Sequence, residues 1–235
     1  MAYNNYGNSF QRTTPVVLNL IIINVLVFAA QNMIPPSQFD VDQWGSLHYF
    51  KSSYFKPHQL ITHMFMHLNV AHILFNMFGL WMFGTILERY WGPKKFLIFY
   101  LICGVGSAIL EQFIQPYDAL QMAKISEEYL NKGIPLNLIT EAYLNNSSSL
   151  GASGAIMGVF AAFAYLFPNT ELYLMFIPIP VKAKYAIPFF VLIDLFGGVY
   201  RIKGDNIGHF AHLAGALIGF LLVLYWNKTN KKTFY

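Results

Sequence analysis

Six long apolar stretches constrain the fold of this chain more than any other feature of its sequence. They occupy residues 16–34, 69–87, 95–114, 150–167, 185–199 and 207–226, and the fifth is the shortest. A helix needs about 20 mostly apolar residues to cross a bilayer, and these stretches have that length or nearly so. The sequence therefore predicts an all-α fold, a polytopic membrane protein with a bundle of six transmembrane helices.

The composition supports a membrane protein. Charged residues make up 11% of the chain and hydrophobic residues 56%, whereas a soluble domain has about 25% charged residues. No small-residue cleavage site follows the first apolar stretch, so we expect a retained helix there and not a removed signal peptide. The single cysteine, Cys103, lies in the third stretch. It cannot form an intrachain disulfide, and we interpret it as a small buried apolar residue.

The distribution of basic residues predicts the orientation in the membrane. With the N-terminus inside, the inner segments carry nine Lys and Arg residues and the outer loops carry six. Because basic residues are enriched on the cytoplasmic side, both termini are expected in the cytoplasm. The predicted organisation is a cytoplasmic tail over residues 1–15, a membrane domain over 16–226 with an outer insertion at 115–144, and a basic tail over 227–235. An extended inner connector is expected at Ile177-Pro178-Ile179-Pro180, since alternating prolines exclude a helix.

A serine among small residues opens the fourth stretch, in the sequence Gly151-Ala152-Ser153-Gly154-Ala155. One interpretation is close helix packing, because Gly154 and Gly158 are four residues apart and small residues let membrane helices approach. The other is a nucleophile, and the remaining polar residues in the apolar stretches bear on that choice.

Polar side chains in two other stretches are expected at the depth of Ser153. With this topology the second, fourth and sixth helices begin at the outer face. His72 and Asn76 share one face of the second helix, and His212 lies near the start of the sixth, so at about 1.5 Å per residue all lie at a similar depth. An imidazole within reach could take the proton of Ser153, and an amide or ring N–H could stabilise an oxyanion. Gly215 and Gly219 would bring the sixth helix close to the fourth.

These motifs together resemble the rhomboid family of intramembrane serine proteases, in its bacterial six-helix form. The resemblance covers residues 15–226 and rests on the Ser153 motif, His212-Leu213-Ala214-Gly215 with Gly219, and His72-Ile73-Leu74-Phe75-Asn76 preceded by His63 and His67. It implies that Ser153 is the nucleophile of a Ser/His dyad and His212 its general base. It also implies an oxyanion hole of His72, Asn76 and the backbone of Ser153 and Ala152, with Gly154, Gly215 and Gly219 in helix packing.

The resemblance further implies transmembrane protein substrates cleaved near the outer face of the bilayer, a multi-pass location in a bacterial inner membrane, no cofactor and no nucleic-acid partner. It assigns no function to the insertion, to His209 or to Asp194. Asp194 is the only acidic residue deep in an apolar stretch. We expect it to bind a hydroxyl or a loop amide, with a role in orienting the catalytic groups as the alternative.

Three other functions remain as alternatives. A rhomboid-like protein without activity could bind membrane proteins, but the presence of both Ser153 and His212 argues against it. A metal-dependent protein could use histidines, although no His-Glu-x-x-His motif is present and only Asp205 is an acid close to a histidine. A transporter is less well supported, because no inverted repeat is visible.

Overall fold

The protein is described here by a computed structural model, in which residues 14–173, 180–200 and 208–229 are described. Most of this part of the chain is helical. The 3₁₀ segment is called η1, and η2 is a π-helical segment that joins α4 to α5. In chain order the elements are α1 (Pro15–Met33), α2 (Val41–Gly45), β1 (Leu47–His48), α3 (Gln59–Thr62), η1 (His63–Phe65), α4 (Val70–Gly79), η2 (Leu80–Gly84), α5 (Thr85–Trp91), α6 (Pro93–Lys124), α7 (Glu127–Asn131), α8 (Leu136–Asn146), β2 (Ser148–Ser149), α9 (Ser153–Leu166), β3 (Glu171–Tyr173), β4 (Pro180–Lys182), α10 (Ala183–Val199) and α11 (His209–Thr229).

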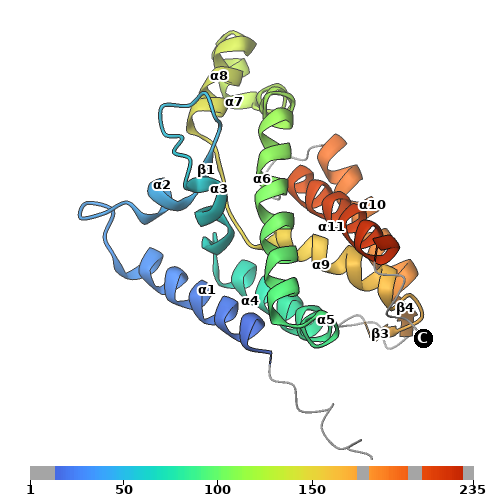
Figure 1. Ribbon diagram of the computed structural model, residues 1–235. Helices are drawn as coiled ribbons and strands as arrows, with labels where there is room; N and C mark the ends of the chain where they lie inside the picture. The colour runs from blue at the N-terminus through green and yellow to red at the C-terminus, as the bar shows by residue number, and fades with distance from the viewer. Residues whose placement is uncertain (1–13, 174–179, 201–207, 230–235) are drawn as a thin grey trace, which may run out of the picture.

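The helices identify a multi-pass membrane protein. Within the described residues, four helical segments are long and apolar enough to cross a bilayer: Pro15–Met33, Val70–Trp91, Pro93–Lys124 and His209–Thr229. Helices α9 and α10 occupy the fourth and fifth predicted spans, but they have 14 and 17 residues. The count of six crossings therefore stays a prediction. In Figure 1, α1 begins and α11 ends at the end of the molecule opposite to α7 and α8. Which end faces the cytoplasm also stays a prediction.

The third apolar stretch belongs to a longer helix than the sequence predicted. Residues 115–124 were expected in the outer insertion, but α6 continues through Pro116 to Lys124. A proline inside a helix removes one backbone N–H and bends the helix, but the hydrogen bonds of the neighbouring residues can let the helix continue past it. The rest of the insertion forms α7 and α8 beyond the end of α6 (Figure 1), and α8 packs against α6. Residues 1–13 of the predicted N-terminal tail, Ile177 to Ile179 of the predicted connector and residues 230–235 of the predicted basic tail lie outside the described residues.

A buried carboxylate fixes the start of α1. Glu88, in α5, is 2% exposed. It accepts the backbone N–H groups of Val16 at 3.0 Å and of Val17 at 2.8 Å. The first N–H groups of a helix have no acceptor within the helix, and a negative charge is favourable at that end. Glu88 therefore joins the beginning of the first membrane helix to the end of the second.

A short antiparallel pair links the first long loop to the segment that precedes α9. In this pair Leu47 faces Ser149 and His48 faces Ser148. The side chain of Gln112, in α6, reinforces the link, because its oxygen accepts the Phe50 N–H at 2.7 Å and its nitrogen donates to the His48 carbonyl at 3.3 Å. These bonds hold the residues leading into α9 against the C-terminal half of α6.

Glycines bring the backbones of α9 and α11 into direct contact. A Cβ placed at Gly215 would overlap the carbonyl of Gly154, and one at Gly219 would lie 2.5 Å from the Cα of Gly158. No side chain larger than hydrogen fits at these positions without moving one helix. The predicted role of Gly154, Gly215 and Gly219 in close packing agrees with this geometry. The contact places the first turns of α9 and α11 side by side, where the candidate site lies.

Candidate functional site

Ser153 is the first residue of α9, and Gly151 shapes the turn before it. Gly151 has φ of +128°, which a side chain would strain, and its N–H donates to the His63 carbonyl at 2.9 Å. A Cβ there would also lie 2.9 Å from Nε2 of His72. Because the first N–H groups of a helix lack intrahelical acceptors, the amides at the start of α9 are oriented to receive a negative charge beside the serine hydroxyl.

His212 lies within hydrogen-bonding distance of Ser153. Its Nε2 is 2.7 Å from the serine Oγ, although the two residues are 59 positions apart in the chain. His212 is in the first turn of α11, and its own N–H donates to the Gly208 carbonyl at 3.1 Å. The glycine contacts between α9 and α11 account for the short distance, since both side chains project from helix starts that touch.

Asp194 lies on the other side of the His212 ring. Its Oδ1 is 3.1 Å from Nδ1 of His212 and 2.8 Å from Nδ1 of His209. A carboxylate only accepts hydrogen bonds, so both rings donate through Nδ1–H. His212 then presents the lone pair of Nε2 to the serine hydroxyl. The expectation that Asp194 binds a hydroxyl or a loop amide was wrong, because its partners are two histidine rings.

The sequence contains a pattern from which the contact of Asp194 with His209 and His212 could have been predicted. Helices α10 and α11 are consecutive and joined by few residues, so residues near the connection face each other when the helices pack as neighbours. Asp194 lies within two turns of the end of α10, and His209 and His212 lie in the first turn of α11. An acid near the end of one helix and two histidines at the start of the next indicate a contact between them.

His72 is held by residues at the start of α4. The side chain of Asn69 caps this helix by accepting the His72 N–H at 2.8 Å, which is the favoured use of asparagine at a helix start. Nδ1 of His72 accepts the Leu68 N–H at 3.4 Å. In the neutral ring Nε2 therefore carries the proton and faces Gly151 as a donor.

Asn76 follows His72 by one helical turn and faces the same cavity. It is 7% exposed, and its Nδ2 has no hydrogen-bond acceptor among the described residues. A buried donor without an acceptor is costly unless another molecule supplies one. The amide is therefore available to an oxygen that enters the cavity.

One cavity of about 640 Å³ contains all four predicted side chains: Ser153, His212, His72 and Asn76. We call it the active-site cavity. These four side chains come from three helices, α4, α9 and α11. Ser107 and Glu111 of α6 also line it, and the sequence did not single them out. The catalytic roles of these residues stay predictions.

His63 and His67 are buried beside the cavity and were predicted to support the outer loop. Nδ1 of His63 donates to the Gln59 carbonyl at 2.8 Å. The ring of His67 meets the ring of His72 edge-on, with centroids 5.1 Å apart. Burial lowers the pKa of each from 6.5 to about 4. His63 also lines the cavity and its carbonyl accepts the Gly151 N–H, so the two histidines support Gly151 and His72.

The described residues contain no group of three or more His, Cys, Asp and Glu side chains that could hold a metal ion. Asp205, the acid considered for such a site, lies outside the described residues.

Known proteins show the same domain. The Rhomboid domain family matches residues 54–228. The chain is 32% identical over 222 residues to RHOMBOID-like protein 12, mitochondrial, of Arabidopsis thaliana, over 93% of this chain and 60% of that protein. It is 29% identical to the Presenilin-associated rhomboid-like protein, mitochondrial, of Homo sapiens, over 94% of this chain and 51% of that protein. It is 28% identical to Rhomboid protease GluP of Bacillus subtilis, over 67% of this chain and 24% of that protein.

The chain thus spans less than two thirds of the length of each of these relatives. The domain match alone covers most of the chain and contains every predicted site residue. The predicted family is therefore confirmed, and the chain belongs to the rhomboid family.

Proposed function

We propose that this protein is an intramembrane serine endopeptidase that cleaves transmembrane segments of other membrane proteins. The observation that carries the proposal is the distance of 2.7 Å between His212 Nε2 and Ser153 Oγ. In the same cavity lie a ring N–H, a buried amide and the start of a helix. Nucleophile, base and oxyanion donors around one open volume are the parts that acyl transfer needs.

The geometry supports a two-step mechanism. Ser153 Oγ attacks the scissile carbonyl while its proton moves to Nε2 of His212. The carboxylate of Asp194 holds the ring through Nδ1–H and stabilises the imidazolium that forms, which makes Asp194 a positioning residue. His212 then gives the proton to the leaving amine. In the second step a water molecule attacks the acyl group while its proton moves to His212, and His212 returns that proton to Ser153 Oγ as the acyl group leaves.

Three kinds of hydrogen-bond donor would stabilise the developing oxyanion. These are the Asn76 amide, the Nε2–H of His72 and the backbone N–H of Ser153, with the turn at Ala152 beside it. A donor of this kind contributes about 2.7–4 kcal/mol to transition-state stabilisation when it is fixed in advance. The helix start adds a favourable dipole at the same point.

A bacterial inner membrane stays a prediction for the location. The family includes relatives whose names place them in mitochondria and one bacterial relative whose name calls it a protease. The proposal requires only that the protein span a membrane together with its substrates, and it involves no cofactor or nucleic acid.

Labelling with a fluorophosphonate probe tests the proposal. The purified full chain is expected to be labelled, and Ser153→Ala is expected to lose the label and the cleavage of a model transmembrane substrate. Ser107→Ala is the matched control, because it removes a serine hydroxyl from the same cavity and should keep the label. Binding of substrates without labelling or cleavage would identify an inactive binder. Cleavage that survives Ser153→Ala and stops with a chelator would instead identify a metal mechanism.

A further inference from the structure

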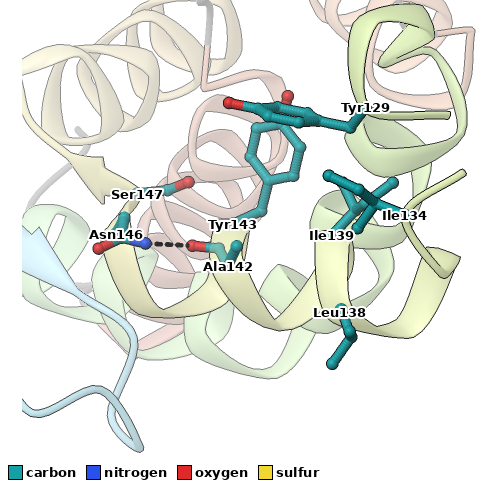
Figure 2. Close-up of a pocket in the computed structure, with 8 residues that line it drawn as sticks. All are labelled: Tyr129, Ile134, Leu138, Ile139, Ala142, Tyr143, Asn146 and Ser147. Atoms are coloured by element: carbon teal, nitrogen blue, oxygen red, sulfur yellow. Dashed lines mark hydrogen bonds between the residues drawn. The ribbon is translucent and has the colours of Figure 1, made fainter. Parts of the chain in front are cut away.

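Two regions outside the active-site cavity differ in how they are connected to it. One is a pocket of about 370 Å³ in the insertion, between α7 and α8. In Figure 2 the hydrogen bond at this pocket, from Asn146 to the Ala142 carbonyl, stays within α8. Among the described residues, no hydrogen bond links the lining of this pocket to the four predicted site side chains. The other region is the end of α1, and hydrogen bonds do connect it to His72.

Gln31 lies in the last turn of α1 and does not line the active-site cavity. Its side-chain amide pairs with the backbone of His67. The amide oxygen accepts the His67 N–H at 3.0 Å, and the amide nitrogen donates to the His67 carbonyl at 3.2 Å. The same nitrogen donates to Oδ1 of Asp42, in α2, at 2.6 Å. Since an amide nitrogen has two hydrogens, these bonds use both of them and fix the orientation of the Gln31 amide.

The bond to the His67 carbonyl also fixes the position of the next N–H. The His67 carbonyl and the Leu68 N–H belong to one peptide group, which is planar. Gln31 holds this group on its carbonyl side, and on its N–H side the group donates to Nδ1 of His72 at 3.4 Å. That distance is longer than the usual range of about 2.7–3.2 Å, so a small rotation of the peptide group would break the bond.

Nδ1 of His72 must accept this bond if the ring is to donate to an oxyanion. A neutral imidazole carries its proton on either Nδ1 or Nε2. When Nδ1 accepts the Leu68 N–H, the proton is on Nε2, the atom that faces Gly151. In the other tautomer Nε2 would present a lone pair to the oxyanion and repel it. The ring of His67 meets that of His72 edge-on, with centroids 5.1 Å apart, and limits its rotation.

We propose that Gln31 is a positioning residue that keeps His72 in the tautomer with the proton on Nε2. It acts through the peptide group between His67 and Leu68. The proposal rests on the proposed function, because it assigns the His72 ring to the oxyanion. It gives α1, none of whose residues lines the active-site cavity, a part in the chemistry. It also gives a reason for the attachment of α1 at both ends, by Glu88 at its start and by Gln31 at its end.

The tautomer of His72 tests the proposal without any measurement of activity. Nitrogen NMR chemical shifts distinguish protonated from unprotonated ring nitrogens, and comparison with His72→Ala assigns the signals. In the wild type the proton is expected on Nε2, and in Gln31→Leu both tautomers are expected. Asn32→Leu is the matched control, because Asn32 is the next residue of α1, is exposed and donates to the Phe28 carbonyl of its own helix. This control should keep the wild-type tautomer.

Cleavage of a model transmembrane substrate gives the second measurement. Gln31→Leu should lower kcat by about 3-fold to 10-fold with KM nearly constant, which is the range that one hydrogen bond accounts for. Gln31→Glu keeps the size and polarity of the side chain and should lose as much, because a carboxylate cannot donate to the His67 carbonyl. In a His72→Ala background, Gln31→Leu should cause no further fall, since the ring on which it acts is absent. Asn32→Leu should keep the wild-type kcat.

Two outcomes would overturn the proposal and leave the proposed function intact. In one, Gln31→Leu keeps the wild-type tautomer of His72. In the other, Gln31→Leu lowers kcat by the same factor with and without the His72 ring, as expected if Gln31 only stabilises the fold. Absence of cleavage and of fluorophosphonate labelling in the wild type would contradict the proposed function instead, and the NMR measurement would still decide whether Gln31 sets the tautomer.

Discussion

Replacement of Asp194 by asparagine tests the mechanism most directly. The variant keeps the size of the side chain and removes its negative charge. In the structure Oδ1 accepts from two rings, at 2.8 Å from His209 and 3.1 Å from His212. The amide oxygen of asparagine can accept from the same two N–H groups, so the ring of His212 should keep its orientation.

The expected loss follows from the missing charge. A hydrogen bond to a charged group contributes about 1.5–3 kcal/mol. His212 is positively charged only after it has taken the serine proton, so this stabilisation applies in the transition state. Because about 1.4 kcal/mol corresponds to a tenfold change in rate, kcat should fall by about 10-fold to 150-fold with KM nearly constant.

In serine proteases with a Ser-His-Asp triad, replacement of the aspartate by asparagine lowers kcat by about 10⁴-fold, because the asparagine holds the histidine in the wrong tautomer. A smaller loss is expected here, because His209 donates to the same Asp194 oxygen and helps to keep the amide oxygen in place.

The assay is cleavage of a model transmembrane substrate by purified variants in detergent, with kcat and KM measured separately. His209→Gln is the control, because it removes the second ring and leaves the Asp194–His212 bond, so kcat should stay near the wild-type value. Asp194→Glu should recover part of the activity. A fall in kcat of less than about 3-fold for Asp194→Asn, with the protein folded, would refute the role given to this carboxylate.

Three further predictions concern packing and stability. Gly215→Ala should cost about 1–3 kcal/mol by overpacking and should lower kcat about 100-fold, because its Cβ would push α11 away from Gly154; equal activity would contradict the packing argument. Glu88→Gln should lower the free energy of unfolding by about 1 kcal/mol, as for loss of a helix cap, which thermal melts in detergent would detect. His63 and His67, with pKa values lowered to about 4, stay neutral in the fold while the unfolded chain gains protons below about pH 6.5. Stability should therefore fall between about pH 6.5 and 4, by about 1.4 kcal/mol per pH unit for each histidine, and a flat pH profile would disprove it.

The proximity of Ser153 and His212 could be predicted from the sequence. Each residue stands near the start of an apolar stretch, and in the predicted topology both stretches begin at the same face of the membrane. His72 and Asn76 share one helix face by their spacing of four. These inferences need only the rise of a helix and the alternation of direction from one crossing to the next.

The sequence pattern did not predict the length of α6. Pro116 and the polar residues after it are typical of a loop. The helix nevertheless continues, with Ala119 8% exposed and Ala123 fully buried, and α8 packs against it. This packing is a tertiary contact that the local pattern does not contain. The partner of Asp194 was missed for a similar reason, since periodicity gives the face of a helix and not the residue opposite.

The length of α9 leaves room for water inside the bundle. With 14 residues this helix is about 21 Å long, about 9 Å shorter than the hydrocarbon core of a typical bilayer. None of its residues is exposed, and it packs against α6, α10 and α11, so protein and not lipid surrounds it. Polar groups at membrane depth are tolerated where they line a water-filled cavity, and the active-site cavity lies at the start of α9. The short helix therefore leaves space beside Ser153 for the water that the proposed hydrolysis would consume.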